Sequence, residues 1–264
     1  MIAMLAACGV SDDQEVALGA RNAREINAQL PIVTDPQIAD YVTALGNSIA
    51  KRTSRANLDW HFYVVNTSDV NAFALPGGFI YVNRGLIERT ERLDQLAGTL
   101  GHEIGHVVLR HSVEQMKKAT GANVGINVVC SLTSFCDSRA SRVMINAAGS
   151  ALFAKYSRHD EAEADSEAVV NVVNAGIDPG GIPELFQILL SEQGRNPTVI
   201  DGFFASHPFE ASRVEHTRQL IARYNPQRLR GLTADDAGYA AFKRAVAALP
   251  PARLPDQVRA DPPP

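Results

Sequence analysis

The amino-acid sequence predicts an α+β fold, with mostly helices and one small β-sheet. Apolar residues recur at helical spacing along much of the chain, for example at Ile38 and Val42. Two runs of aromatic and β-branched residues, at 60–65 and 79–82, predict strands instead. Pro76-Gly77-Gly78 lies between these runs and marks a turn.

Helices account for most of the remaining sequence. Asp35 and Pro36 supply an N-cap and a first-turn residue for the second helix. Gly176 stands where the C-terminal cap of a later helix belongs. The predicted helical segments are 12–30, 35–52, 84–90, 92–117, 151–175, 181–192, 209–224 and 233–248.

Length and composition limit the classes of function. The 264 residues suffice for one large domain, and the net charge of -4 argues against nucleic acid as a partner. No segment reaches the ~18 uninterrupted apolar residues of a membrane span. We expect one domain at 9–248, preceded by a short separate segment at 1–8 that is the remnant of a leader sequence. Proline and charge dominate 249–264, which we expect to be a disordered tail.

Leu5-Ala6-Ala7-Cys8 resembles a bacterial lipobox, in which the cysteine is lipidated and becomes the mature N-terminus. No basic region or long apolar run precedes it, so we expect the natural start to lie upstream. Gly9, rather than Asp, follows the cysteine and favours the outer membrane. The expected location is therefore the bacterial envelope, in the periplasm. The alternative is a cysteine that follows the start methionine by chance.

Cys130 and Cys136 are the other two cysteines. A compartment that lipidates Cys8 is also oxidising, so these two thiols can form a disulfide there. Two buried thiols are the alternative, and the spacing does not decide between them.

His102-Glu103-Ile104-Gly105-His106 is the motif that carries chemistry. Residues four apart lie on one face of a helix, so the two imidazoles can bind one zinc ion. Glu103 lies about 100° around that helix, where its carboxylate can reach a water on the metal. The motif therefore predicts a zinc site with Glu103 as general base.

The surrounding sequence agrees with a helix that packs closely. Leu96 and Leu100 continue the apolar periodicity through the motif. Gly98, Gly101 and Gly105 form a smooth stripe, which predicts the close approach of another backbone. Local packing, without a role in chemistry, explains these glycines best.

A hydrolytic zinc site uses three protein ligands and one water. Leu109 and Ser112 occupy the positions where a metzincin has glycine and histidine, so that class is excluded. His111 lies about 140° away from the ligand face of a continuous helix, and we expect it at the surface.

A later helix offers the third ligand. Glu161 and Asp165 share one stripe with apolar residues as far as Val172, so both carboxylates point toward the core. A buried carboxylate needs a cation or hydrogen-bond donors. Glu161 is the predicted ligand, and Asp165 can accept a hydrogen bond from a ligating imidazole. Glu163 lies about 200° around the same helix from Glu161, so it is a poor candidate for a metal ligand.

Four segments in one order resemble a known family. They are Asn71-Ala72-Phe73-Ala74-Leu75-Pro76-Gly77-Gly78, the HExxH motif, Ser157-Arg158 with Glu161-x-x-Ala164-Asp165, and Ser206-His207-Pro208. Together they resemble the bacterial BepA/HtpX and eukaryotic CAAX-prenyl-protease family of gluzincin metallopeptidases, over roughly residues 12–224. The sequence looks most like the short periplasmic lipoprotein members, so CAAX processing is not expected.

The resemblance implies that His102, His106 and Glu161 bind zinc and that Glu103 is the general base. It also implies that His207 lies near the metal, as a plug or as a group that binds the transition state. The alternative is that Ser206-His207-Pro208 only starts a helix.

The expected function is a zinc endopeptidase, with one Zn²⁺ per chain, that acts on misfolded or unassembled envelope proteins. We expect an extended substrate to pair with the second predicted strand. The residues of that predicted substrate site are Phe79, Ile80, Tyr81 and Val82. The alternative is that this strand is fully paired in its own sheet. Two rival functions are a zinc-stabilised chaperone without proteolysis and a lipoprotein scaffold with a fortuitous motif.

Overall fold

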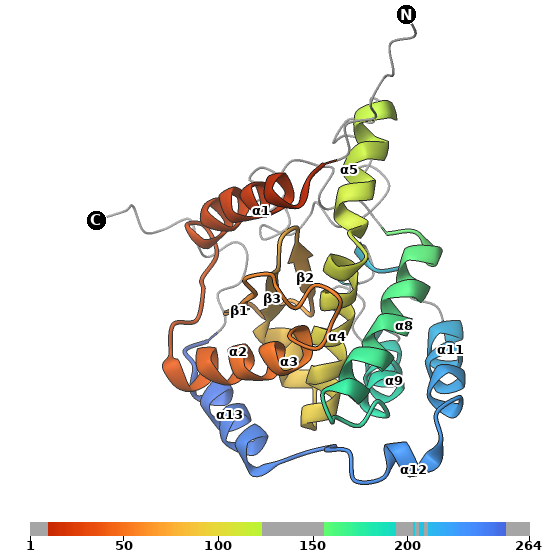
Figure 1. Ribbon diagram of the computed structural model, residues 1–264. Helices are drawn as coiled ribbons and strands as arrows, with labels where there is room; N and C mark the ends of the chain where they lie inside the picture. The colour runs from red at the N-terminus through yellow and green to blue at the C-terminus, as the bar shows by residue number, and fades with distance from the viewer. Residues whose placement is uncertain (1–9, 123–155, 194–202, 204–205, 209–210, 252–264) are drawn as a thin grey trace, which may run out of the picture.

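A computed structural model describes residues 10–122, 156–193, 203, 206–208 and 211–251. Within these ranges the fold is α+β, with helices around a three-stranded sheet, as the sequence predicts (Figure 1). The three cysteines, the leader and most of the tail lie outside the described residues. None of the described helices is both long and apolar enough to span a bilayer.

The helices follow the predicted order, with changes at several ends. They are α1 (Asp12–Asn27), α2 (Pro36–Ala50), α3 (Arg84–Arg89), α4 (Leu93–Val108), α5 (His111–Ala122), α8 (Arg158–Asn174), α9 (Gly181–Gln193), α11 (Ala211–Ala222), α12 (Pro226–Leu229) and α13 (Ala237–Ala248). Asp35 caps α2 by accepting a hydrogen bond from the backbone N–H of Gln37, as expected. The predicted helix 92–117 is wrong in one respect, because it is broken between α4 and α5.

The sheet contains β1 (His61–Val65), β2 (Ala72–Leu75) and β3 (Phe79–Asn83), in the order β1-β3-β2. β3 pairs in parallel with β1 and antiparallel with β2. The sequence did not predict β2, because four residues with two alanines carry little strand signal.

The central position of β3 corrects one prediction about the substrate. The backbone of β3 is hydrogen-bonded to a strand on each side, and all of its residues are buried. It therefore has no free edge for an extended peptide. The expectation that Phe79, Ile80, Tyr81 and Val82 bind substrate in this way is wrong, and the alternative, a strand paired in its own sheet, is correct.

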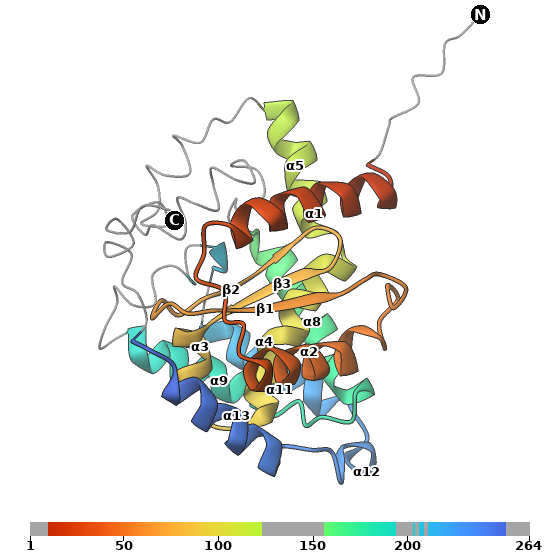
Figure 2. The same cartoon turned by 90° about the vertical axis from the view of Figure 1, so that its left-hand side faces the viewer.

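Helices cover both faces of the sheet. Figure 2 shows α1 on one side and α2 and α4 on the other. Ile26 of α1 packs with Phe73 and Tyr81 on the first face, whereas Ile80 and Val82 belong to the larger core on the second. Alternate residues of β3 thus face opposite cores, which is the period of a strand buried on both sides. This arrangement holds α4 firmly beside the sheet.

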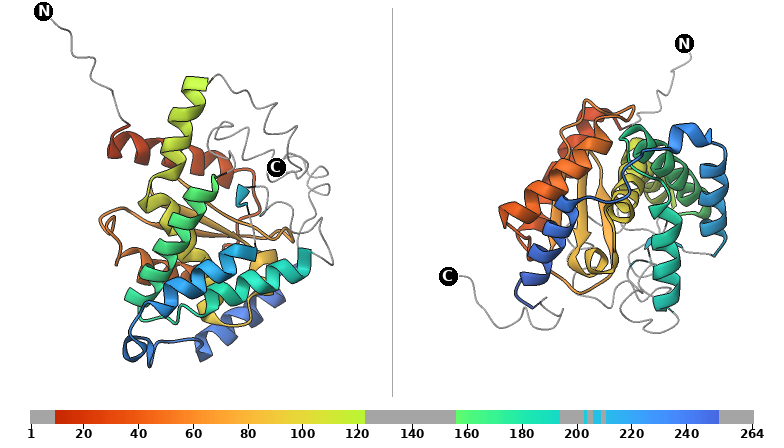
Figure 3. Two further views of the ribbon diagram at one scale, coloured as in Figure 1. Left: turned by 90° about the vertical axis from the view of Figure 1, so that its right-hand side faces the viewer. Right: turned by 90° about the horizontal axis from the view of Figure 1, so that it is seen from below.

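α4 lies at the centre of the helical layer. It contacts α8, α9 and β2, and the view from below in Figure 3 shows α8, α9 and α11 together on one side of it. The predicted glycine stripe faces these neighbours. A Cβ on Gly101 would lie 3.1 Å from Cγ1 of Val172, and one on Gly105 would lie 3.1 Å from the carbonyl oxygen of Ala164. The glycines therefore let α4 and α8 approach closely.

We expect Gly101→Val to lower the free energy of unfolding by about 1–3 kcal/mol, because the added side chain overpacks the α4–α8 interface. Urea unfolding of the purified protein measures the effect. Ala211→Val, at an exposed position that begins α11, is the matched control and should change stability little. Equal stabilities of Gly101→Val and the wild type would show that the α4–α8 interface can hold the larger side chain without strain.

Candidate metal centre

α4 brings the two histidines of the HExxH motif together. His102 and His106 are buried, and their Nε2 atoms lie 3.1 Å apart. Both lie on one helical face because four residues make about one turn. Their other ring nitrogens face away, toward different partners.

α8 supplies the carboxylate that the sequence predicts as third ligand. Ser157 caps this helix by accepting a hydrogen bond from the backbone N–H of Asp160, so Glu161 falls in the first turn. Glu161 Oε2 lies 3.5 Å from His102 Nε2, and Glu161 Oε1 lies 3.5 Å from His106 Nε2. The three predicted ligands thus surround one point.

His207 lies in the same cluster and is 1% exposed. Its Nδ1 atom is 3.0 Å from Glu161 Oε1 and 3.4 Å from His102 Nε2. Its Nε2 atom is 3.5 Å from Glu103 Oε1. The side chains of His102, His106, Glu161 and His207 form one group of potential metal ligands.

The spacing of these atoms fits a metal ion. Tetrahedral ligands about 2.0–2.1 Å from one zinc ion are about 3.4 Å from each other. The distances of 3.1 Å between the His102 and His106 Nε2 atoms and 3.5 Å from each to Glu161 are close to this value. Two imidazoles and one carboxylate are also donors that zinc accepts in hydrolytic sites.

Glu103 gives independent support for this fit. It is 0% exposed, and neither carboxylate oxygen has a hydrogen-bond partner among the described residues. Burial raises the pKa of this carboxyl group. Buried polar atoms of this kind are rare without a bound water or ion, because an unmade hydrogen bond is costly.

Asp165 lies where the sequence predicts a partner for a ligating histidine. Its Oδ1 atom is 3.0 Å from His102 Nδ1. A proton on Nδ1 leaves Nε2 as the unprotonated nitrogen, which is the one that a metal needs. Arg213 of α11 binds both oxygens of Asp165, at 2.8 and 2.6 Å.

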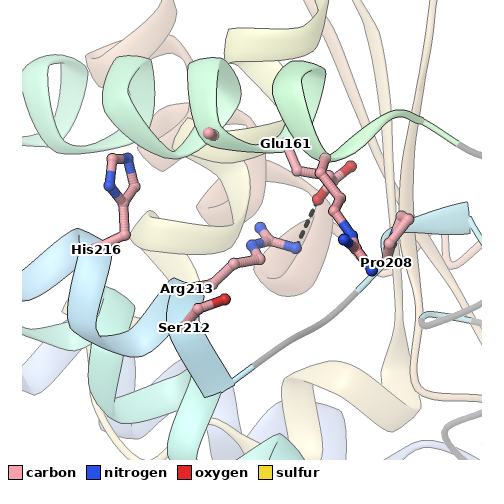
Figure 4. A pocket seen from close by; sticks show the side chains of 7 residues that line it. Glu161, Pro208, Ser212, Arg213 and His216 are labelled. Carbon is pink, nitrogen blue, oxygen red and sulfur yellow. Dashed lines mark ion pairs between the residues drawn. The ribbon is translucent and has the colours of Figure 1, made fainter.

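Arg213 also reaches Glu161, with Nη1 at 2.6 Å from Oε2. Figure 4 shows this ion pair at the wall of a pocket of about 250 Å³. The pocket is lined by Arg158, Glu161, Ala162, Pro208, Ser212, Arg213 and His216.

The charges of the site are set by these contacts. Burial opposes the charge on Glu161, yet His207 and Arg213 hold its pKa well below the usual range. Burial likewise opposes ionisation of Asp165, and Arg213 and His102 outweigh it to lower that pKa. Burial alone would lower the pKa of His102, but Asp165 and Glu161 raise it to about 9. Two anionic carboxylates thus lie beside the imidazoles, and the Arg213 guanidinium pairs with both of them.

Three residues of the site were missed from the sequence. Arg213 lies in a predicted helix with no pattern that marks it as buried. Tyr156 stacks on the ring of His106 at a centroid distance of 3.8 Å and gives no motif signal. His111 was expected at the surface, which is wrong: it is 5% exposed, and its Nδ1 atom lies 2.9 Å from His106 Nδ1. The helix break before His111 invalidates the angle from which its exposure was predicted.

Glu103 separates this site from a purely structural one. A structural zinc site closes its four positions with protein ligands, whereas a hydrolytic site places a carboxylate at the edge to move protons. On this ground the fold and the site define an HExxH metallopeptidase. Comparison with known proteins gives the particular family: the chain belongs to peptidase family M48, whose profile matches residues 36–221.

Several curated relatives are metalloproteases. The chain is 29% identical to the beta-barrel assembly-enhancing protease of Yersinia pestis, over 82% of this chain and 46% of the relative. It is 36% identical to metalloprotease YcaL of Escherichia coli, over 70% of this chain and 69% of the relative. It is 28% identical to metalloprotease LoiP of the same organism, over 82% of this chain and 84% of the relative. The chain spans about half the length of the beta-barrel assembly-enhancing proteases that it matches.

Proposed function

We propose that this protein is a zinc endopeptidase that hydrolyses peptide bonds of misfolded or unassembled proteins of the bacterial cell envelope. His102, His106 and Glu161 hold the metal in this proposal, and Glu103 is the general base. The observation that carries it is the buried Glu103 carboxylate, which lacks a hydrogen-bond partner among the described residues and lies beside the ligand cluster.

Each residue of the site has its own role in the proposed hydrolysis. A bound zinc ion would supply a Lewis acid that acidifies water and polarises the scissile carbonyl. Glu103 takes a proton from the attacking water and then delivers it to the leaving amine. Asp165 holds His102 in the tautomer that presents Nε2.

His207 has a second role in the proposal. Its Nδ1 atom lies among the potential ligand atoms, so in this arrangement the ring would serve as a further ligand in place of water. The backbone N–H of His207 donates to the carbonyl oxygen of Phe203 at 2.8 Å. In the proposal the His207 ring leaves the ligand atoms before catalysis, and its N–H can then donate to the oxyanion.

The substrate is proposed to bind as an extended chain along β2 instead of β3. β2 is at one edge of the described sheet and contacts α4, which carries the motif; its four residues are buried, so the proposal requires this edge to become exposed. Backbone hydrogen bonds along an edge strand recognise a chain with little dependence on its side chains. That mode suits unfolded segments better than folded ones.

The envelope location rests on two kinds of support. The name of one group of relatives associates those proteins with β-barrel assembly. The lipobox-like sequence around Cys8 adds a lipid anchor to the proposal, which would hold the enzyme at the outer membrane. Mass spectrometry of the N-terminus of the mature protein tests the anchor.

Removal of the metal is expected to abolish proteolysis. Purified protein loaded with one equivalent of zinc should cleave casein or another unfolded chain. A chelator should stop cleavage, and zinc added in excess should restore it, because the metal supplies the Lewis acid. Gel analysis of the products over time gives the result. A chelated sample that cleaves as fast as the loaded one would rule out a metallopeptidase.

The rival function, a zinc-stabilised chaperone, predicts a different outcome in the same assay. Such a protein would bind the unfolded chain in a zinc-dependent way without cutting it. Zinc binding alone has no use for the Glu103 carboxylate, which lacks a hydrogen-bond partner among the described residues, so the structure favours the protease. Zinc-dependent suppression of aggregation without any cleavage would support the chaperone.

A further inference from the structure

The ring of His111 lies against the side of His106 that faces away from the ligand cluster. The Nδ1 atoms of the two rings are 2.9 Å apart, and both side chains are buried. On its other side, His111 Nε2 lies 3.4 Å from Glu163 Oε2. The Glu163 side chain is partly exposed to solvent. Three side chains thus lead from the ligand cluster toward solvent.

The backbone is built to place His111 there. Arg110 has φ of 60°, and it is the one residue other than glycine with positive φ among the described residues. This conformation is unfavourable for a side chain with a Cβ, so contacts elsewhere must hold it. The guanidinium of Arg110 supplies them: Nε lies 2.8 Å from Glu15 Oε2, Nη1 lies 3.0 Å from Asp12 Oδ1, and Nη2 donates to the carbonyl oxygen of Val10 at 2.7 Å.

The consequence of this turn is a change in direction of the chain. On a continuous helix His111 would point about 140° away from the face of His106. The break after α4 returns it to that face. Arg110 directly follows the C-cap residue Leu109, where helices commonly end in the left-handed conformation, and its three contacts to the α1 region hold this turn beside the metal site.

We propose that His111 is a positioning residue that fixes the tautomer of His106. A hydrogen bond between two Nδ1 atoms needs one proton, on one ring only. When His106 carries it, His106 Nε2 is unprotonated and faces the metal, and His111 accepts at Nδ1. The single proton of neutral His111 is then on Nε2, and it is donated to Glu163. His111 thus does for His106 what Asp165 does for His102.

A second cation site at the same place is the competing interpretation. His111, Asp160 and Glu163 are close enough to share a metal ion. A cation on His111 Nε2 would move the ring proton to Nδ1, where it would face the N–H of His106 at 2.9 Å. Asp160 Oδ2 is also occupied by the backbone N–H of Ser157. The geometry therefore favours a hydrogen-bond relay over a metal site.

Two substitutions at one position test the proposal, which rests on the proposed metal site. His111→Phe keeps a flat ring but removes the acceptor, and zinc affinity should fall by about 10–100-fold. His111→Asn keeps an acceptor near the position of Nδ1, and affinity should stay near that of the wild type. Glu163→Ala should lower affinity less than His111→Phe does, because its distance to the ring is longer and its side chain is half exposed.

Zinc affinity is measured by competition with a coloured chelator, and the absorption bands of the cobalt-substituted protein report the ligand geometry. We expect the bands to shift in His111→Phe and not in His111→Asn. His159→Asn is the matched control, because this exposed histidine lies 3.6 Å from the same oxygen of Glu163, on the solvent side of the relay. It should leave both readouts unchanged.

Three results would overturn the proposal. One is wild-type zinc affinity and unshifted cobalt bands in folded His111→Phe. Another is an equal loss in His111→Asn and His111→Phe, which would assign the effect to packing. The third is a second zinc equivalent in the wild type that Glu163→Ala removes. His106→Ala separates this from failure of the proposed function: if it too keeps full zinc affinity, the metal site itself is wrong.

Discussion

Replacing Glu103 by glutamine is expected to lower the rate of peptide hydrolysis by about 10²–10⁴-fold, the range for loss of a general acid–base. The amide has nearly the shape of the carboxylate, but it does not take up the proton of water. Zinc content should stay at one equivalent, because Glu103 is not among the four potential ligands in the cluster. Steady-state cleavage of a quenched peptide and metal analysis of the same sample give the two numbers.

Stability provides a check on this interpretation. The buried carboxylate of Glu103 lacks a hydrogen-bond partner among the described residues, so a neutral amide should be tolerated without loss of unfolding free energy. Glu25→Gln, at an exposed position of α1, is the matched control and should leave hydrolysis intact. Hydrolysis by Glu103→Gln at the rate of the wild type would remove Glu103 from the mechanism.

Replacing Arg213 by methionine is expected to cost about 3–5 kcal/mol of unfolding free energy in the metal-free protein. The change removes the cation that binds Asp165 through both oxygens and pairs with Glu161. Two buried carboxylates would then lose the guanidinium that compensates their charge. Bound zinc should recover part of the loss, because the metal neutralises Glu161. Urea unfolding with and without zinc measures both quantities.

The stabilisation by Arg213 should depend on pH. Arg213 helps to hold the pKa values of Glu161 and Asp165 below the usual range, so the stability it adds is present above the unfolded carboxyl pKa of about 4. That stability is lost as the pH falls through the folded pKa values. The difference in unfolding free energy between wild type and Arg213→Met should therefore narrow as the pH falls below about 4.

Two further variants of α11 complete this test. Arg213→Lys should recover little of the stability that Arg213→Met loses, because one ammonium group cannot replace a guanidinium that binds both oxygens of Asp165. Arg218→Met, at an exposed position of the same helix, is the control and should be nearly neutral. If Arg213→Met loses as little unfolding free energy as Arg218→Met does, the buried ion pairs of Arg213 add no stability.

Local sequence signals predicted the parts of the fold that depend on periodicity. Leu96 and Leu100 of α4 and the stripe that contains Glu161 and Asp165 of α8 each lie on a buried face, as their spacing indicates. The metal cluster followed from these two helices, because each ligand was predicted on the face that turns inward. The close α4–α8 packing at Gly101 also follows the predicted stripe.

Tertiary structure decided the features that the sequence did not predict. β2 is a strand because β3 pairs with it, and its own residues carry little preference. The burial of Arg213 depends on carboxylates that come from another helix. The position of His111 depends on the left-handed conformation of Arg110, which ion pairs with distant α1 residues stabilise. In each case the cause lies far away in the sequence.

Anomalous X-ray diffraction at the zinc absorption edge, from crystals of the zinc-loaded protein, tests the central claim most directly. We expect one strong peak between His102 Nε2, His106 Nε2 and the Glu161 carboxylate, with His207 as a fourth ligand in the arrangement described above. A peak at His111, Asp160 and Glu163 instead, or no peak within reach of His102 and His106, would contradict the account.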